Sequence, residues 1–298
     1  MKLVFLNGGL ANQVFQYLFF RCGQIRHPEE EWILDDSFFY VHQVHHGYEL
    51  GKVFGADDQN LLSRHFDQDV WDYMIEQKKE NNRSIPQIMK TYGTEFVMLA
   101  QCDNYKKWNP FDGEVMDVSA AAFHPEIMDV KGNIYYHGYW IGRAWFDTFQ
   151  NTFGQKLIFP EMLPQDSLNQ KYRSHILSVN STLLHIRRGD YVTDGLTMPI
   201  HCYSQMISKM LEYVPDMVLF VFSDDPDWCE VHAQEIGLTL AAETVYVRGN
   251  QNENAFRDLE LMSLCKNVLV SNSAFCYLAT LLNQNIHYIL NPTNRKTR

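Results

Sequence analysis

The sequence has few positive charges, no closely paired cysteines and no long apolar run. Its 298 residues include 25 Lys and Arg against 36 Asp and Glu, which gives a net charge of −11. This acidic balance argues against bulk binding of nucleic acid but is compatible with a local basic pocket for a phosphate. No stretch approaches the ~18–20 apolar residues of a membrane span, so any membrane association would be peripheral.

The six cysteines are spaced widely and irregularly, and no CxxC motif occurs. In a chain of this length such spacing predicts reduced, mostly buried thiols rather than a disulfide framework or a zinc site. The apolar run after Lys2 is interrupted at Asn7, which is too early for the hydrophobic region of a signal peptide. We therefore expect a cytoplasmic protein.

Strand-like and helix-like segments alternate along the chain. The start indicates a strand at Lys2–Leu6, a glycine turn, a helix from Asn12 to about Arg26 and a strand at Glu31–Asp35. Residues 40 to about 130 are harder to interpret, and the helical stretches near 58–80 and 84–92 are only moderately periodic. Asn133–Gly138 is the next expected strand.

After the proline-containing linker expected at Gly154–Ser167, the alternation becomes regular. Strands are expected at Thr182–Ile186, Met217–Phe222, Val245–Val247, Val268–Val270 and His287–Leu290, and helices at Tyr203–Tyr213, Asp227–Ile236, Glu253–Cys265 and Ala274–Asn283. This order predicts an α/β fold with a mostly parallel, doubly wound sheet, in which ligands bind at the carboxyl ends of the strands.

The densest polar segment, His185-Ile186-Arg187-Arg188-Gly189-Asp190-Tyr191, ends an apolar strand. Arginine offers planar bidentate donors that match phosphate oxygens, so Arg187 and Arg188 indicate a nucleotide phosphate. Asp190 can hold one arginine in position, and Gly189 can let the backbone turn sharply. The alternative is a surface salt-bridge cluster, which is disfavoured because adjacent arginines at the end of a buried strand are costly.

Gly8-Gly9-Leu10-Ala11-Asn12-Gln13 connects the first strand and helix. Glycines let the backbone approach a ligand, and the N–H groups of a helix N-terminus attract an anion. The segment is not GxGxxG and Asp35 is only a loose match to the acidic residue of a dinucleotide site, so a nicotinamide enzyme is disfavoured. The alternative is a tight turn with Asn12 as the helix N-cap.

Aspartates follow the strand that ends near Phe222. Asp224 and Asp225 can accept hydrogen bonds from the N–H groups of a purine, or they can ligate a metal. Asp225-Pro226-Asp227 matches the D-x-D of metal-dependent glycosyltransferases, but Asp-Pro at a helix start is also common capping chemistry. We expect Asp227 only to cap its helix.

Ser271-Asn272-Ser273-Ala274-Phe275 lies between a predicted strand and a predicted helix. Small hydroxyl residues with open backbone N–H groups can cradle a phosphate, although such a segment alone is more often an ordinary N-cap. We expect it beside the arginine site. His42, His45 and His46 have no carboxylate or cysteine at ligand spacing, so we expect no metal there.

Together, four segments resemble the α-1,2-fucosyltransferases of glycosyltransferase family 11. Gly8–Tyr17 is similar to the GGLGNQ opening of that family, and His185–Tyr191 matches its HIRRGDY element letter for letter. Phe220–Asp225 resembles its FxFSDD element, and Asp258–Asn283 resembles its final DLxLMSxCK and SNS region. The four segments occur in the order and spacing of the family.

The resemblance implies a GT-B architecture, in which two Rossmann-like domains with parallel sheets face each other across a cleft. Residues 1–155 would bind the acceptor and residues 165–298 would bind GDP-fucose. It also implies inverting, metal-independent transfer of L-fucose from GDP-β-L-fucose to the 2-hydroxyl of a terminal galactoside in a cell-surface glycan. No cofactor is implied besides this donor substrate.

The resemblance further implies roles for individual residues. Arg187 and Arg188 would hold the diphosphate, His185 and Asp190 would support their loop, and Asn12 would face the donor from the other domain. Asp224 or Asp225 would read the guanine, and Ser273 with the N–H groups that follow would cap a phosphate. The residues expected at the donor are Gly9, Leu10, Ala11, Asn12, Gln13, His185, Arg187, Arg188, Asp224, Asp225, Asn272, Ser273, Ala274 and Phe275, with Arg187, Asp190 and Asn12 as the catalytic set.

The chain departs from the family pattern in two places within these segments. Ala11 stands where a glycine is usual, and Cys276-Tyr277 stands where a tryptophan-containing pair is usual. These departures leave open a sugar-nucleotide-binding protein with lost or altered activity, and the D-x-D match leaves open a metal-dependent transferase that uses Asp225 and Asp227. No carboxylate is identified as the general base, and Asp194 is one candidate.

Overall fold

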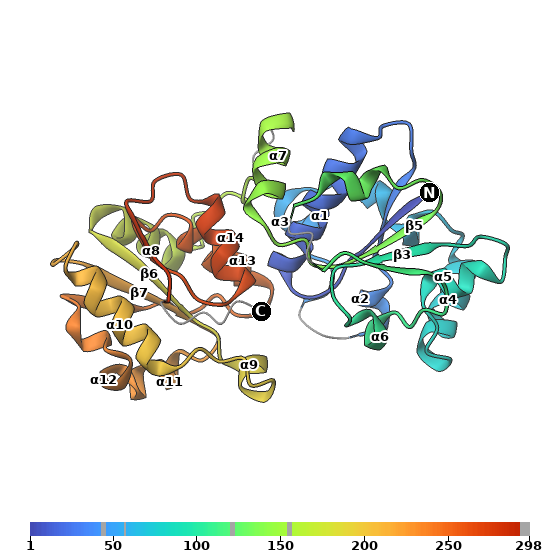
Figure 1. The fold of residues 1–298 in the computed structure, drawn as a ribbon. Helices are drawn as coiled ribbons and strands as arrows, with labels where there is room; N and C mark the ends of the chain where they lie inside the picture. The colour runs from blue at the N-terminus through green and yellow to red at the C-terminus, as the bar shows by residue number, and fades with distance from the viewer. Residues whose placement is uncertain (43–45, 57, 120–122, 154–156, 293–298) are drawn as a thin grey trace. The chain divides into compact units, whose positions relative to one another are not determined.

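Two five-stranded parallel sheets form the framework of the chain, which a computed structural model describes over residues 1–42, 46–56, 58–119, 123–153 and 157–292 (Figure 1). The chain divides into two units, Met1–Ile158 and Phe159–Arg298. The division falls inside the segment expected as a linker. The predicted fold class, α/β with two Rossmann-like units and parallel sheets, is confirmed.

The first sheet has the strand order β2-β1-β5-β3-β4, with every pair parallel. Its strands are β1 (Lys2–Phe5), β2 (Trp32–Asp35), β3 (Val97–Ala100), β4 (Val115–Asp117) and β5 (Ile134–His137). Its helices are α1 (Leu10–Arg26), α2 (Phe38–Val41), α3 (Leu50–Phe54), α4 (Gln68–Glu80), α5 (Ile85–Lys90), α6 (Tyr105–Trp108) and α7 (Arg143–Phe153), with 3-10 turns at Asp58–Asn60, Leu62–Arg64 and Pro125–Asp129.

Helices cover both faces of this sheet (Figure 1). On one face α1 packs against α7, where the ring of Phe19 stacks on Trp140 at 4.0 Å and meets the edge of Trp145 at 5.1 Å. On the other face α2, α4, α5 and α6 surround a core that includes Phe38 and Trp71. Burial on both faces explains why the central strands read as continuous apolar runs.

Between residues 40 and 130, where the sequence pattern indicated only moderately periodic helical stretches, the structure also contains β3 and β4. β3 has four residues and β4 has three, and β4 lies at the partly exposed edge of the sheet. Because the β4 side chains are partly or fully exposed, this strand shows no buried apolar run, and the short apolar run of β3 was not singled out.

The second sheet has the order β10-β9-β6-β7-β8 and is also parallel throughout. Its strands are β6 (Ser181–Ile186), β7 (Val218–Ser223), β8 (Glu243–Tyr246), β9 (Asn267–Leu269) and β10 (Tyr288–Leu290). Its helices are α8 (Ser167–Ser178), α9 (Gly189–Thr193), α10 (Ile200–Leu211), α11 (Pro226–Val231), α12 (Ala233–Ile236), α13 (Ala255–Met262) and α14 (Ala274–Leu282), with 3-10 turns at Leu238–Leu240 and Asn252–Asn254. All five predicted strands are present within two residues of the expected bounds.

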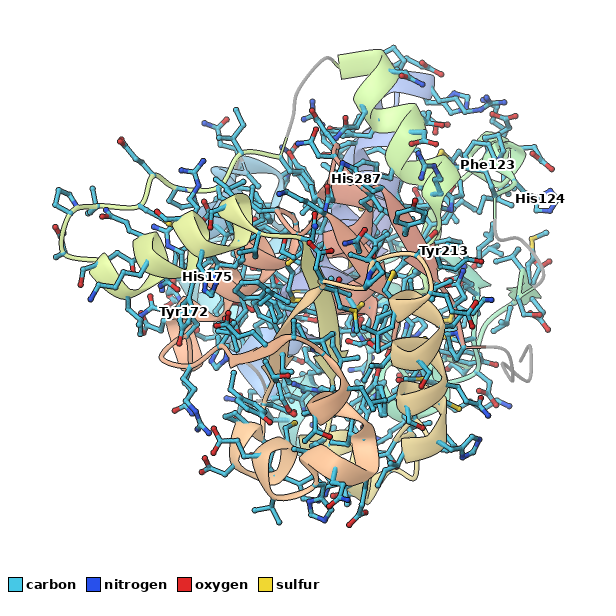
Figure 2. All side chains as sticks on the ribbon, turned by 90° about the vertical axis from the view of Figure 1, so that its left-hand side faces the viewer. Phe123, His124, Tyr172, His175, Tyr213 and His287 are labelled. Carbon is cyan, nitrogen blue, oxygen red and sulfur yellow. The ribbon has the colours of Figure 1, made fainter. Side chains whose placement is uncertain are left out.

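Helix α8, which the sequence analysis did not identify, is fastened to the sheet by its aromatic side chains. Figure 2 shows Tyr172 and His175 on this helix. The Tyr172 hydroxyl donates to the backbone oxygen of Tyr246 at 3.5 Å and accepts from the backbone N–H of Arg248 at 3.2 Å. The helix expected at Asp227–Ile236 is two helices, because the backbone at His232 leaves the helical region between α11 and α12.

The cysteine prediction is confirmed: all six are free thiols, and five of them are buried. Burial raises the pKa values of Cys22, Cys229 and Cys265, which suits inert core thiols. In the part of the chain that the structure describes, no helix is long and apolar enough to cross a bilayer.

Candidate active site

Three of the predicted segments meet at one edge of the second sheet. Strand β6 pairs with β7 up to Ile186 and Ser223, and with β9 up to Leu184 and Leu269. The residues that follow these three parallel strands therefore leave the sheet side by side. The expectation that the Ser271–Phe275 segment neighbours the arginines is confirmed.

Arg187 is held between two carboxylates at this edge. Its Nε donates to Oδ1 of Asp190 at 2.9 Å, and its Nη1 lies 2.9 Å from Oδ2 of Asp224. The side chain is 31% exposed, so the guanidinium is fixed in direction but reachable from solvent. A guanidinium carries five N–H donors, and these two contacts leave others for a ligand anion.

Asp224 holds the loop as well as the guanidinium. Its Oδ1 accepts from the backbone N–H of Arg188 at 2.8 Å. A Cβ at position 189 would lie 2.7 Å from Oδ2 of Asp224, so Gly189 makes room for this carboxylate. Gly189 begins α9 three residues after the end of β6, and its φ is not positive.

Arg188 points toward an aromatic ring. Its guanidinium lies 3.7 Å from the centroid of the Trp228 ring, and Trp228 in turn stacks on His232 at 4.3 Å. The Nε of Arg188 is buried and has no hydrogen-bond partner among the described residues. Since a buried donor without an acceptor is costly, this N–H is suited to receive an anion.

The segment after β9 supports the arginine loop through hydroxyl groups. His185 Nδ1 lies 3.1 Å from Oγ of Ser271, and the Tyr191 hydroxyl is hydrogen-bonded to the side chain of Ser273. Burial, with a smaller effect of Arg187, lowers the pKa of His185 to about 3, so this imidazole is neutral and is not a proton donor to a phosphate.

Ser273 is the N-cap of α14, and its Oγ accepts from the backbone N–H of Phe275 at 3.2 Å. Asn272 is exposed and donates from Nδ2 to the backbone oxygen of Leu196 at 2.6 Å. Cys276 is fully buried, so its departure from the family pattern changes the core rather than a ligand surface. Ala274 begins the helix beside the arginine loop.

Asp225 and Asp227, at this edge of the sheet, have other partners than the sequence predicted. Asp225 is the N-cap of α11, and its Oδ1 accepts from the backbone N–H of Trp228 at 3.1 Å. Asp227, which was expected to cap the helix, instead pairs with Nη1 of Arg248 at 2.7 Å. Asp225 and Asp227 thus have separate protein partners, and the described residues contain no group of three metal-ligating side chains.

In the first unit, Asn12 does not cap α1. The helix begins at Leu10 with Gly9 as N-cap, which places Asn12 inside the first turn. Gly8 has φ of +75°, and a Cβ there would lie 2.6 Å from Nδ2 of Asn12, so glycine is required beside this amide. Ala11 is buried, and its methyl group packs within the unit.

Gln13 is fully buried and holds two loops together. Its Nε2 donates to the backbone oxygens of Gly8 at 2.9 Å and Gly47 at 2.8 Å, and its Oε1 accepts from the backbone N–H of Glu49 at 2.9 Å. Both Nε2 protons and the Oε1 atom of Gln13 are thus used in hydrogen bonds within the protein. Its side chain therefore holds these loops in place and does not face a donor, contrary to the sequence prediction.

The sequence analysis did not identify two carboxyl groups with strongly raised pKa values. Glu49 accepts from the backbone N–H of Leu10 at the start of α1, and burial raises its pKa to about 7. In the second unit, burial raises the pKa of Asp258 to about 7, and Asn250 Nδ2 donates to its Oδ1 at 2.8 Å. Asp258 begins the segment that resembles the family, whereas no local pattern marks Glu49, and the pKa shifts of both come from tertiary burial.

The histidines near residue 42 behave as aromatic packing where the structure describes them. His42 lies against Phe38 at 4.7 Å and Trp108 at 4.9 Å, and burial lowers its pKa. His46 is exposed, and His45 lies outside the described residues. Asp194 is exposed at the C-terminal end of α9, one turn after Asp190.

Comparison with known proteins places these segments in a family context. The model of glycosyl transferase family 11 matches residues 129–297, more than half of the chain. An alpha-1,2-colitosyltransferase of Escherichia coli is 25% identical over 295 residues, which cover 97% of this chain and 90% of that protein. The O-antigen biosynthesis glycosyltransferase WbnK of Escherichia coli is 26% identical over 296 residues, which cover 93% of this chain and 89% of the relative.

Solved structures show the same fold. The fucosyltransferase NodZ from Bradyrhizobium matches with a TM-score of 0.51 at 14% identity, over 94% of this chain and 92% of that one. A NodZ alpha-1,6-fucosyltransferase co-crystallized with GDP matches with the same TM-score and identity, over 94% of this chain and 91% of that one. At such low identity the likeness is one of fold.

Proposed function

The chain belongs to glycosyl transferase family 11, and from this membership we propose that it transfers L-fucose from GDP-β-L-fucose to the 2-hydroxyl of a terminal galactoside. In this proposal the second unit binds the donor, the first unit binds the acceptor, and the product is part of a cell-surface glycan. The relative named for O-antigen biosynthesis supports that destination.

The observation that carries the proposal is the arginine loop at the end of β6. Breaking the bond between fucose and phosphate places negative charge on the departing diphosphate. Arg187, fixed by Asp190 and Asp224, and the buried Nε of Arg188 are preorganised donors for such charge. Because the carboxylates already hold the guanidinium in place, little reorganisation is needed during the reaction.

The N-terminus of α14 adds a second group of donors at the same edge of the sheet. Its first backbone N–H groups follow Ser273, and a helix N-terminus favours negative charge. His185, which is neutral, supports the strand end through Ser271 rather than supplying a proton. Asp225 and Asp227 have protein partners, so this mechanism assigns them no metal.

The experiment that tests this proposal includes a second donor sugar, because one relative is named for the transfer of colitose. The protein should be incubated with GDP-fucose or the colitose donor and a panel of β-galactosides, in buffer with excess chelator. Mass and linkage analysis should show a fucosylated product with an α-1,2 bond. Product only from the colitose donor would change the proposed sugar, and loss of product in chelator would restore the metal-dependent alternative.

GDP binding without any product would favour the alternative of a sugar-nucleotide-binding protein. Calorimetry with GDP on the same preparation separates this outcome from a failure to bind the donor. Absence of both binding and transfer would contradict the donor assignment as a whole.

A further inference from the structure

A relay of hydrogen-bonded side chains runs through the first unit and ends at the carboxyl edge of its sheet. Nζ of Lys78 lies 2.8 Å from Oδ1 of Asn109, whose Nδ2 lies 3.2 Å from Nδ1 of His137. Nε2 of His137 lies 2.7 Å from Oδ1 of Asn104, whose Nδ2 donates to the Tyr139 hydroxyl at 3.1 Å. The first three residues are buried, whereas Asn104 and Tyr139 are half-buried.

The direction of every bond in this relay is determined from both ends. The Lys78 amino group donates, so Asn109 presents its oxygen to Lys78 and its NH2 group to His137. At the other end burial raises the pKa of the Cys102 thiol, which stays protonated and lies 2.8 Å from Oδ1 of Asn104. Both ends therefore require that His137 carries its proton on Nε2. Burial, with a smaller effect of Lys78, lowers the pKa of His137 to about 3, so the ring is neutral.

The relay ends where the chain leaves two neighbouring strands toward opposite faces of the sheet. The segment after β5 leads to α7, on the face that α1 also covers, and the segment after β3 leads to α6, on the other face (Figure 1). Ligands of open parallel sheets bind outside the strand ends at such a switch point. Asn104 follows β3 and Tyr139 follows β5.

Both segments are held in place at this point. Oε1 of Gln101 accepts from the backbone N–H groups of Tyr139 at 3.0 Å and Trp140 at 2.8 Å. Trp140 has φ of 54°, a left-handed conformation that is strained for a bulky residue and persists only where its surroundings impose it. The position of Tyr139 is thus set by the sheet and not by a mobile loop tip.

We propose that this edge binds the acceptor sugar, with Asn104 and Tyr139 as hydrogen-bonding partners of its hydroxyl groups. The proposal rests on the proposed transfer to a galactoside. Of the two Nδ2 protons of Asn104, the described residues accept one, at Tyr139. Neutral amide and hydroxyl groups held in fixed directions match the neutral hydroxyl groups of a sugar.

His137, Asn109 and Lys78 act as positioning residues in this proposal. They determine which way the Asn104 amide faces, because a flipped amide would place its NH2 group against the Nε2 proton of His137. Nitrogen-15 NMR of the ring should show the neutral tautomer with the proton on Nε2 across pH 5–8. A proton on Nδ1 would contradict the relay.

Tyr139→Phe and Asn104→Asp test the binding edge itself. Asn104→Asp keeps an oxygen toward His137 and Cys102 but removes the NH2 donor. Each variant should raise the KM for the acceptor about two- to tenfold, the range expected for one neutral hydrogen bond, without changing the Kd for GDP. Tyr92→Phe, at a tyrosine that is 70% exposed in the same unit, is the matched control.

The outcomes separate this proposal from the proposed function. If the parent protein transfers fucose and neither variant raises the acceptor KM, the binding edge is wrong while the function stands. If the parent transfers no sugar to any galactoside, the function fails, and titration with methyl β-galactoside decides the binding edge. Shifts of the Asn104 side-chain NH2 resonances in the parent, weakened in Tyr139→Phe, would support the edge, and unchanged resonances would overturn it.

Discussion

Replacing Arg187 with alanine should abolish detectable transfer and weaken GDP binding, because this guanidinium is the best-fixed donor at the expected diphosphate site. The contacts with Asp190 and Asp224, both at 2.9 Å, use Nε and Nη1 and leave the Nη2 side for the ligand. Removing the guanidinium takes away the bonds to phosphate. It also leaves two carboxylates without their shared counter-charge beside an anionic ligand.

The size of the effect follows from these contacts. One or two charge-assisted hydrogen bonds at roughly 1.5–3 kcal/mol each, reduced for the partial exposure of the side chain, amount to about 2–4 kcal/mol. At about 1.4 kcal/mol per factor of ten, the Kd for GDP should rise roughly 30- to 1,000-fold. Arg187→Lys should recover little of this, because one ammonium cannot reproduce the planar fork that spans both carboxylates.

Isothermal calorimetry with GDP measures this change, and thermal melting checks that each variant is folded. Arg248→Ala is a matched control, because Arg248 also pairs with two carboxylates, Asp227 at 2.7 Å and Glu230 at 2.8 Å, and is similarly exposed. Its GDP affinity should equal that of the parent. If Arg187→Ala binds GDP like the parent, Arg187 is not a phosphate ligand and the donor site must be sought elsewhere.

Three further predictions concern neighbouring groups. In calorimetry Asp224→Asn should weaken GDP binding more than Asp225→Asn, since Asp224 holds the arginine loop and Asp225 caps a helix. If GDP, IDP and ADP inhibit the parent protein equally, neither aspartate contacts guanine. Trp228→Ala should lower GDP affinity about two- to tenfold by releasing the Arg188 guanidinium, and Trp228→Phe should restore most of that affinity. If both variants bind GDP like the parent, the stacking does not position Arg188. Burial raises the pKa of Glu49 from its ordinary 4.5 to about 7, so the folded state keeps a proton that the unfolded state loses, and the free energy of unfolding should fall as pH rises through this window. In urea unfolding, Glu49→Gln should lose less stability than the parent between pH 5 and 8. Equal losses in the two proteins would refute this assignment.

Much of the framework could be predicted because its signals are local. Strands β6 and β7 are buried on both faces, so they appear in the sequence as uninterrupted apolar runs with polar residues directly after them. A parallel sheet places such strand ends along one edge, which is why His185–Tyr191, Asp224 and Ser271–Phe275 could be expected together. Strand β4 was missed because its exposed edge position leaves no buried apolar run to recognise.

The task of each polar side chain could not be predicted in the same way. Asp224, Asp225 and Asp227 lie within four residues, yet one holds Arg187, one caps α11 and one pairs with Arg248. Which partner each one meets depends on the register that brings Ile186 opposite Ser223, and no spacing within the segment contains that information.

The sequence by itself therefore determined the α/β alternation, the strand ends that carry chemistry and the family resemblance, because hydrophobic period and motif are properties of neighbouring residues. Only the tertiary structure decided that Gln13 is an internal clamp, that Glu49 sits in surroundings that raise its pKa, and that Lys78 is linked to Tyr139 across the first unit. These features come from burial and from pairings between residues far apart in the chain. Their free energies depend on desolvation and fixed geometry, which exist only once the sheets and helices have packed.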